Sequence, residues 1–301
     1  MSDKRWMKRG ELTTSQLVML IILITSFIII LFLLFRLNLG EQTNQEICRN
    51  SVIARGSPVL PTETIPLNCK RSYVCVTEDD SCESLTDPIK EKVETQEEAY
   101  GVLANEMANC WWMFGEGKVN YVGEDFTENL YCSICSQIAF DDSVKEIFPE
   151  GKIEKEALYK YMQENKVSGR EETYLDYLYG TNNLEEIKAE LDAKSLGLGL
   201  IDINKQYYAM MGITSDVSKL KWATVAAGTA LAIAFTPLIG AHWGLTIGIA
   251  VISGTGGAGA GTVGAFVVEG LSGNEYLAPS VIEVNSQEFK DLDCKSITTL
   301  S

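Results

Sequence analysis

The chain has 301 residues, a net charge of −16 at neutral pH and a single histidine, His242. An acidic surface repels phosphates, so nucleic acid is not expected as a partner. With one histidine, the rest of the chain cannot form a Ser/His/Asp or Cys/His catalytic site or a histidine zinc site. We therefore predict no catalytic residues, no metal site and no cofactor.

Residues 1–14 are predicted to form a basic cytoplasmic N-terminus, and residues 15–36 are predicted to form a transmembrane anchor. Leu17–Phe35 carries no charge, and a helix needs ~20 apolar residues to cross a bilayer. Four basic residues precede this stretch, which by the positive-inside rule places the N-terminus in the cytoplasm and the bulk of the chain outside the cell membrane. A cleavable secretory signal is the alternative, but the apolar stretch is longer and bulkier than such signals.

Residues 37–84 are predicted to form a region of loops and short strands, and residues 85–221 are predicted to form an acidic α-helical ectodomain. Together, residues 37–221 hold 18 Lys and Arg against 33 Asp and Glu. Eight cysteines lie beyond the anchor, on the side where disulfides persist, so all are disulfide candidates with the pairing left open. They are Cys48, Cys69, Cys75, Cys82, Cys110, Cys132, Cys135 and Cys294.

Within this region a strand is expected at Tyr73–Val76. A long amphipathic helix is expected to begin at Asp87 and Pro88 and to end near Phe114, because apolar residues recur there at helical spacing. Three shorter helices are expected, with loops between them, at Ile153–Glu164, Glu171–Tyr179 and Leu184–Ser195.

Residues 222–269 are predicted to form a hydrophobic glycine-zipper hairpin. Residues 270–301 are predicted to form an extracytoplasmic tail with one strand near Ser280–Asn285. Trp222–Val268 runs 47 residues without Asp, Glu, Lys or Arg, about the length of two membrane crossings. A shallow or re-entrant hairpin is the alternative. Small residues at every fourth position would let two helices pack closely. These residues include Gly228, Ala232, Gly240, Gly244, Gly248, Gly256, Ala260 and Gly264.

Two short motifs are candidates for chemistry. Trp111 and Trp112 could stack on a partner or a sugar, and Glu116 with Asp125 could act as an acid and base pair for glycoside cleavage. Packing of these aromatic residues into a small core is the alternative. Cys132 and Cys135 have the spacing of a thiol-disulfide exchange motif, but structural disulfides are the preferred interpretation.

Lys8-Arg9-Gly10-Glu11-Leu12 before an apolar helix resembles the class III signal of archaeal pilin-like proteins, which is cut after the glycine. Ser15 stands where those signals carry a glutamate. The layout is also similar to membrane-anchored, cysteine-containing archaeal envelope proteins of unknown activity. The match rests on the Gly10–Gln16, Cys110–Gly117 and Cys132–Cys135 strings. The uncharged segment is similar in architecture to the helical hairpin of pore-forming colicins.

These features predict a mainly α membrane protein with an N-terminal transmembrane helix, a disulfide-stabilised α-rich ectodomain with minor β structure, and a C-terminal helical hairpin. The predicted function is interaction or assembly at the cell envelope, with the lipid bilayer and further copies or other envelope proteins as partners. The first alternative is membrane permeabilisation by residues 222–268. The second is an extracytoplasmic thiol-disulfide oxidoreductase or a glycan-active enzyme.

Overall fold

The computed structural model describes residues 14–36, 39–57, 65–122, 130–193, 198–214, 233–234, 247–252, 263–269, 275–292 and 294–296. The chain divides into two compact units, Met1–Asn44 and Gln45–Ser301. The first unit contains helix α1 (Thr14–Arg36) and the start of helix α2 (Leu39–Arg55). The second contains the rest of α2 and all the other helices and strands that the structure describes, and we call it the domain.

The described helices are α1 (Thr14–Arg36), α2 (Leu39–Arg55), α3 (Gln96–Met113), α4 (Lys155–Glu164), α5 (Tyr174–Tyr179), α6 (Leu184–Ala193) and α7 (Gln287–Asp291), with a 3-10 helix η2 at Asp142–Glu146. The described strands are β1 (Ser72–Thr77), β2 (Ile89–Lys92), β3 (Tyr131–Phe140), β4 (Lys152–Glu154), β5 (Leu200–Asp202), β6 (Tyr207–Thr214), β7 (Ile233–Ala234), β8 (Ile247–Ile252), β9 (Val263–Glu269), β10 (Glu275–Glu283) and β11 (Lys295–Ser296).

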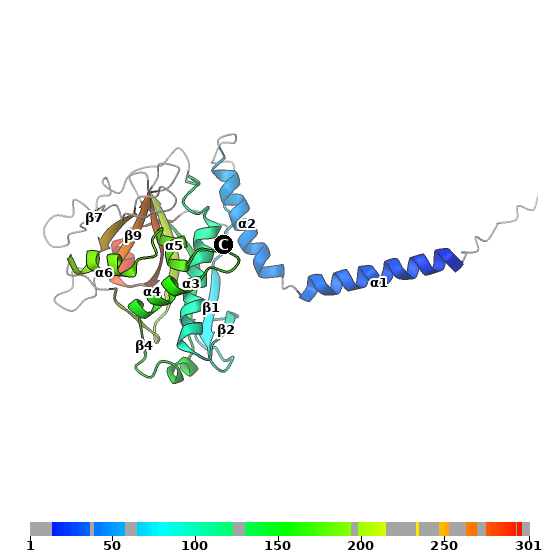
Figure 1. The fold of residues 1–301 in the computed structure, drawn as a ribbon, viewed down its shortest axis with the longest axis horizontal. Helices are drawn as coiled ribbons and strands as arrows, with labels where there is room; N and C mark the ends of the chain where they lie inside the picture. The colour runs from blue at the N-terminus through cyan, green and yellow to red at the C-terminus, as the bar shows by residue number, and fades with distance from the viewer. Residues whose placement is uncertain are drawn as a thin grey trace, which may run out of the picture. The chain divides into compact units, whose positions relative to one another are not determined.

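Nine of the eleven described strands form one mixed sheet (Figure 1), in the order β2-β1-β3-β6-β10-β9-β8-β7 with β11 beside β3. Strands β4 and β5 form a separate antiparallel pair. Strands β2, β1 and β3 run parallel, and every pairing from β3 to β7 is antiparallel. Strand β11 pairs with the start of β3, on the same edge that β1 occupies further along. The domain is therefore mixed α/β, and the prediction of a mainly α protein is wrong.

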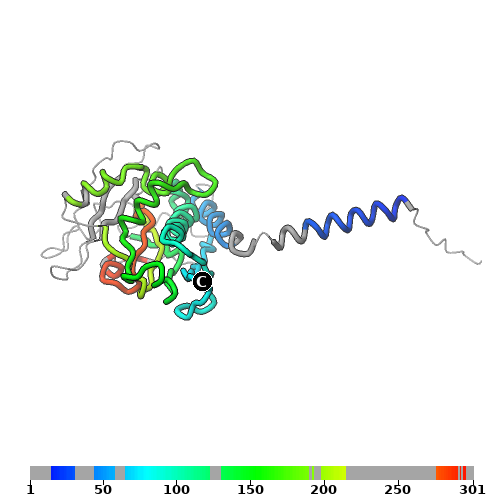
Figure 2. The backbone as a smooth tube through the Cα atoms, turned by 60° about the horizontal axis from the view of Figure 1, so that its bottom comes forward, coloured from blue at the N-terminus to red at the C-terminus, as the bar shows by residue number. Residues whose placement is uncertain are grey.

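Helices α3 and α5 pack on one face of this sheet, and α4 packs on both of them. The strands alternate accordingly: Tyr207, Ala209 and Met211 of β6 belong to the large core under these helices, whereas Met210 faces a smaller core with Leu292 on the other side. In the tube view, β10 (orange to red) lies beside β6 (yellow-green), although about 60 residues separate them (Figure 2). Both faces of the central strands are covered.

Helix α3 begins later than the sequence predicted. Thr95 is its N-cap, and the Thr95 side chain and the Glu98 side chain each bind the backbone of the other residue, forming a capping box. The residues after Pro88 form strand β2 instead, because they pair in parallel with β1. The three shorter helices and the strand at Tyr73–Val76 are confirmed.

The predicted helical hairpin is also wrong, because its described parts are strands. Gly248 lies in β8 opposite Val267, and Gly264 lies in β9 opposite Val251. Ile, Val and Phe are frequent in both strands, which suits a pleated sheet and disfavours a helix. The other predicted packing residues, Gly228, Ala232, Gly240, Gly244, Gly256 and Ala260, lie outside the described residues, as does His242.

Helix α1 covers the predicted anchor, and the side chains described in it, residues 15–30, are all exposed. Among the described residues, no helix is both long and apolar enough to cross a membrane. This finding contradicts the predicted transmembrane anchor and the predicted location in a cell membrane.

The predicted disulfides are confirmed, and all eight cysteines are paired. The bonds are Cys48–Cys69, Cys75–Cys82, Cys110–Cys135 and Cys132–Cys294. Cys132 and Cys135 lie on β3 but face opposite sides of the sheet, in the smaller and the larger core respectively. They therefore bind different partners, because side chains three residues apart on a strand point in opposite directions.

We expect the Cys132–Cys294 bond to stabilise the domain most strongly. It spans 162 residues, whereas Cys75–Cys82 spans 7. Chain entropy then predicts a loss of about 5 kcal/mol for the double serine variant of Cys132 and Cys294, against about 2 kcal/mol for that of Cys75 and Cys82. Urea unfolding of the two variants measures both losses, and a larger loss for the short bond would contradict this account.

Candidate functional site

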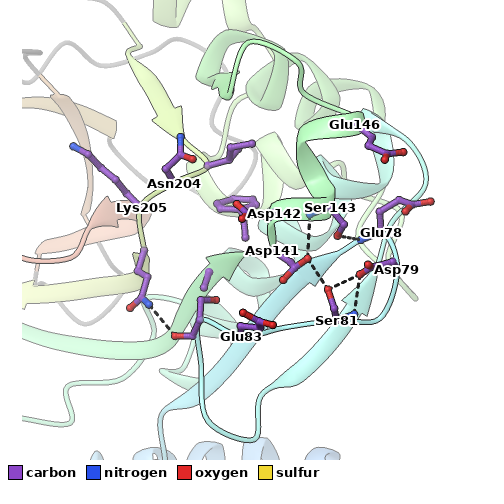
Figure 3. Close-up of a pocket in the computed structure, with 15 residues that line it drawn as sticks. Glu78, Asp79, Ser81, Glu83, Asp141, Asp142, Ser143, Glu146, Asn204 and Lys205 are labelled. Carbon is purple, nitrogen blue, oxygen red and sulfur yellow. Dashed lines mark hydrogen bonds between the residues drawn. The ribbon is translucent and has the colours of Figure 1, made fainter.

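A pocket of about 770 Å³ opens at the edge of the sheet where the parallel strands β1 and β3 end (Figure 3). Val76 pairs with Phe140, so both strands end at the same level. The turn from β5 to β6 contributes Ile203–Gln206, because β6 runs antiparallel to β3 and begins at this edge. Ligands of open α/β sheets bind at such carboxyl ends.

The lining combines carboxylates with a small apolar floor. Ala139, Phe140 and Ile203 supply the floor, and Lys205 is the one cation among the lining residues. The Lys205 ammonium lies 2.8 Å from both carboxylate oxygens of Glu283, outside the pocket. Six acidic residues complete the lining: Glu78, Asp79, Glu83, Asp141, Asp142 and Glu146.

Serine hydroxyls hold two of these carboxylates in place. The Ser81 hydroxyl lies 2.6 Å from Asp79 Oδ1 and 2.7 Å from Asp141 Oδ1, so it bridges the loops that follow β1 and β3 (Figure 3). The Ser143 amide donates to Asp141 Oδ1 at 3.0 Å, and the Ser143 hydroxyl accepts the Glu78 amide at 3.0 Å. The two loops therefore form one hydrogen-bonded unit.

These hydrogen bonds keep both carboxyls charged. The Ser81 hydroxyl and amide lower the pKa of Asp79 to about 2. Desolvation raises the pKa of Asp141, but the hydrogen bonds from Ser143 and Ser81 outweigh it and leave the pKa below its ordinary value. At neutral pH, the pocket therefore presents fixed negative charge.

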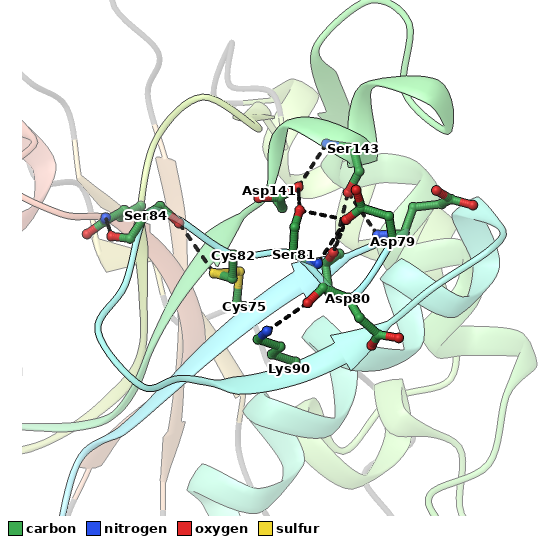
Figure 4. The surroundings of a disulfide bond; sticks show 12 residues. Cys75, Asp79, Asp80, Ser81, Cys82, Ser84, Lys90, Asp141 and Ser143 are labelled. Carbon is green, nitrogen blue, oxygen red and sulfur yellow. Dashed lines mark hydrogen bonds between the residues drawn. A yellow bond between two sulfur atoms is a disulfide. The ribbon is translucent and has the colours of Figure 1, made fainter.

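The loop between β1 and β2 is closed by a disulfide. Cys75 in β1 bonds to Cys82 in the loop, and the Lys90 ammonium donates to the Asp80 carbonyl at 2.7 Å (Figure 4). Asp80 has a positive φ of 65°, which tightens the turn. The pocket wall is thus anchored to the sheet at both ends of the loop.

Among the side chains that the structure describes, no three acidic, cysteine or histidine groups come close enough together to hold a metal ion. The carboxylates are spread around the pocket and come from separate segments. Such an arrangement suits an extended or organic cation better than a small hard ion, which needs its ligands close together.

Glu116 lies elsewhere, in a cluster of cations that we call the cation patch: Arg49, Lys118 and Arg170. The Glu116 side chain is 7% exposed and binds both arginines, the Lys118 ammonium at 3.1 Å and the Tyr177 hydroxyl at 2.9 Å. Residues 115–117 all have positive φ. A side chain at Gly117 would also press on Trp111, so this turn needs glycine.

The surroundings of Glu116 disfavour the predicted role in glycoside cleavage. Desolvation raises its pKa, but hydrogen bonds from Tyr177 and Lys118, with the charges of Lys118 and Arg170, lower it overall. A carboxyl held ionised has no proton to donate as a general acid. Asp125, its predicted partner, lies outside the described residues.

The aromatic residues of this motif are mostly packing residues. Trp111 is buried edge-on against Tyr276, with ring centroids 5.9 Å apart. Trp112 is half-buried under the Arg49 guanidinium, which lies 4.6 Å from the ring centroid and also donates to the Trp112 carbonyl. Trp112 is thus the tryptophan of this motif that reaches the surface.

Sequence reasoning missed the pocket, although a signal was present. Asp-Asp-Ser occurs twice, at residues 79–81 and 141–143. The second copy directly follows β3, and the first follows β1 after one residue, Glu78. Recognising the site required knowing that these strands are neighbours, and β3 was not predicted as a strand.

No protein-family model matches this chain, and no curated protein and no solved structure is similar to it. Any function must therefore be argued from the geometry of the chain itself.

We expect Glu116→Gln to lower the free energy of unfolding by about 2 kcal/mol at pH 7, because three cations lose their shared carboxylate. A carboxyl whose pKa falls on folding stabilises the fold above its unfolded pKa, and this contribution is lost as the pH drops through the folded value. The difference between variant and wild type should therefore shrink below about pH 4.5. Urea unfolding across pH 3–7 measures it.

Glu171→Gln is the matched control. Glu171 is 95% exposed and pairs with Lys166, so its loss should leave the free energy of unfolding almost unchanged. A cost for Glu116→Gln that is as small as this, or that does not vary with pH, would contradict the account.

Proposed function

We propose that this chain is an interaction protein that binds a cationic group of a protein partner in the pocket at the end of β1 and β3. The observation that carries the proposal is the lining, in which six carboxylates surround an apolar floor. A lysine or arginine side chain fits both parts, since its aliphatic stem can lie on Phe140 while its charge meets the carboxylates.

The rigidity of the pocket supports binding. Asp79 and Asp141 are already oriented by the Ser81 and Ser143 hydrogen bonds, so less conformational entropy is lost when a partner binds. Four disulfides also suit a protein that works in an oxidising environment.

The alternatives from the sequence lose their structural support. The thiol-disulfide exchange hypothesis needs Cys132 and Cys135 to bond to each other, but each belongs to a different disulfide. The permeabilisation hypothesis needs a helical hairpin, but β8 and β9 are strands of the sheet. Contact with a lipid bilayer stays a prediction from the sequence.

We expect a fluorescent tetralysine peptide to bind the full chain, with a dissociation constant that rises steeply between ~0.05 and ~0.5 M salt. Glu146→Lys places a cation on the pocket lining and should weaken binding about tenfold or more. Fluorescence anisotropy measures both effects.

The control is Glu171→Lys, which makes the same charge change outside the pocket and should leave the affinity within about twofold at physiological salt. Equal weakening by the two variants would show that only net charge matters. That result would contradict the pocket as the binding site.

A further inference from the structure

The pocket and the cation patch lie at opposite ends of the parallel strands. Helix α3 returns the chain from β2 to the start of β3, so it runs antiparallel to β1 and β3. Near its C-terminal end, Cys110 bonds to Cys135, level with the first residues of β1. Glu116 follows α3 and is therefore at the end of the strands away from the pocket.

The cation patch is positive in an otherwise acidic chain. Three cations, Arg49, Lys118 and Arg170, share Glu116, and Glu172 lies 3.8 Å from Arg170 as the other carboxylate of the cluster. The arginines are held in place, since Arg49 lies over Trp112 and Arg170 lies 4.3 Å from the centroid of Tyr177. Arginine and aromatic side chains fixed in this way are typical of protein interfaces.

Lys118 is the member of the patch that can reach a partner. Its side chain is 55% exposed, compared with 23% for Arg49 and 34% for Arg170. If the Lys118 ammonium leaves Glu116, two arginines and the Tyr177 hydroxyl still bind that carboxylate. Releasing Lys118 therefore does not leave a buried charge unpaired.

We propose that the partner is a second copy of this chain, and that Lys118 of one copy binds in the acidic pocket of the next. This inference rests on the proposed function of the pocket. The two surfaces are different and lie at opposite ends of the domain, so the contact is heterologous. A pair of copies then keeps one free pocket and one free patch in total, and association continues into open chains of copies.

Ionic strength decides whether the contact forms. A net charge of −16 makes two copies repel each other at long range. At ~0.15 M salt the screening length is about 8 Å, so the repulsion between distant charges is largely screened. Lys118 and the pocket carboxylates still attract each other at contact. At ~1 M salt, the screening length of about 3 Å weakens this attraction as well.

The test is sedimentation velocity of the full chain with its disulfides intact, over a range of concentrations. We expect the average mass to grow beyond that of a dimer with concentration at ~0.15 M salt, and to return to that of the monomer at ~1 M. Lys118→Glu and Glu146→Lys should each stop this growth. Lys166→Glu is the matched control, because Lys166 is 57% exposed and is also paired with a glutamate.

An equal mixture of Lys118→Glu and Glu146→Lys, neither of which should associate with itself, tests the contact most directly. The Lys118→Glu copy keeps its pocket and the Glu146→Lys copy keeps its patch, so the mixture should form dimers of one copy of each that do not grow further. Normal growth of Lys118→Glu, or growth stopped equally by Lys166→Glu, would overturn the proposal.

The peptide experiment separates the two proposals. If the wild type binds tetralysine in the pocket but stays monomeric at every concentration, self-association is wrong and the pocket keeps its proposed function. If the wild type does not bind tetralysine at all, both proposals fall.

Discussion

Strand β3 carries two disulfides, one on each face of the sheet, and the rest of the domain depends on them. Side chains alternate along a strand, so Cys132 and Cys135 must face opposite sides of the sheet. Cys135 holds α3 against the larger core, and Cys132 holds the C-terminal segment against the smaller one. Because β3 also pairs with β1, β6 and β11, its position fixes the loops that form the pocket.

The charges of the domain are arranged by the direction of these strands. Carboxylates collect where β1 and β3 end, and a cluster of cations lies beyond the end of α3. The structure handles the two clusters differently: serine hydroxyls and amides stabilise the carboxylates near the surface, whereas the cations share one buried glutamate. The domain therefore carries negative charge at one end of the strands and a cluster of cations at the other, which the net charge alone does not reveal.

Part of this fold was predictable from the sequence, and part was not. Helices α4, α5 and α6 were predicted because their apolar residues recur at helical spacing and their ends carry clear signals. Strands β3 and β6 were missed, since a short run of cysteines, methionines and small residues has no distinctive period. The uncharged segment around Gly248 and Gly264 was misread, because a strand of a large sheet can be as free of charge as a membrane helix. The pocket could not be predicted, since Asp79 and Asp141 meet only through the pairing of β1 with β3.

The pairing of Cys132 with Cys294 has a consequence for how the chain matures. Cys135 can bond to Cys110, which is synthesised before it, but Cys132 must wait until another 162 residues have been made. During that interval its thiol is free and lies close in sequence to other cysteines. Thiol-disulfide exchange can then join it to a wrong partner. Biogenesis of this protein should therefore depend on a disulfide isomerase more than on the oxidant that forms the first bonds.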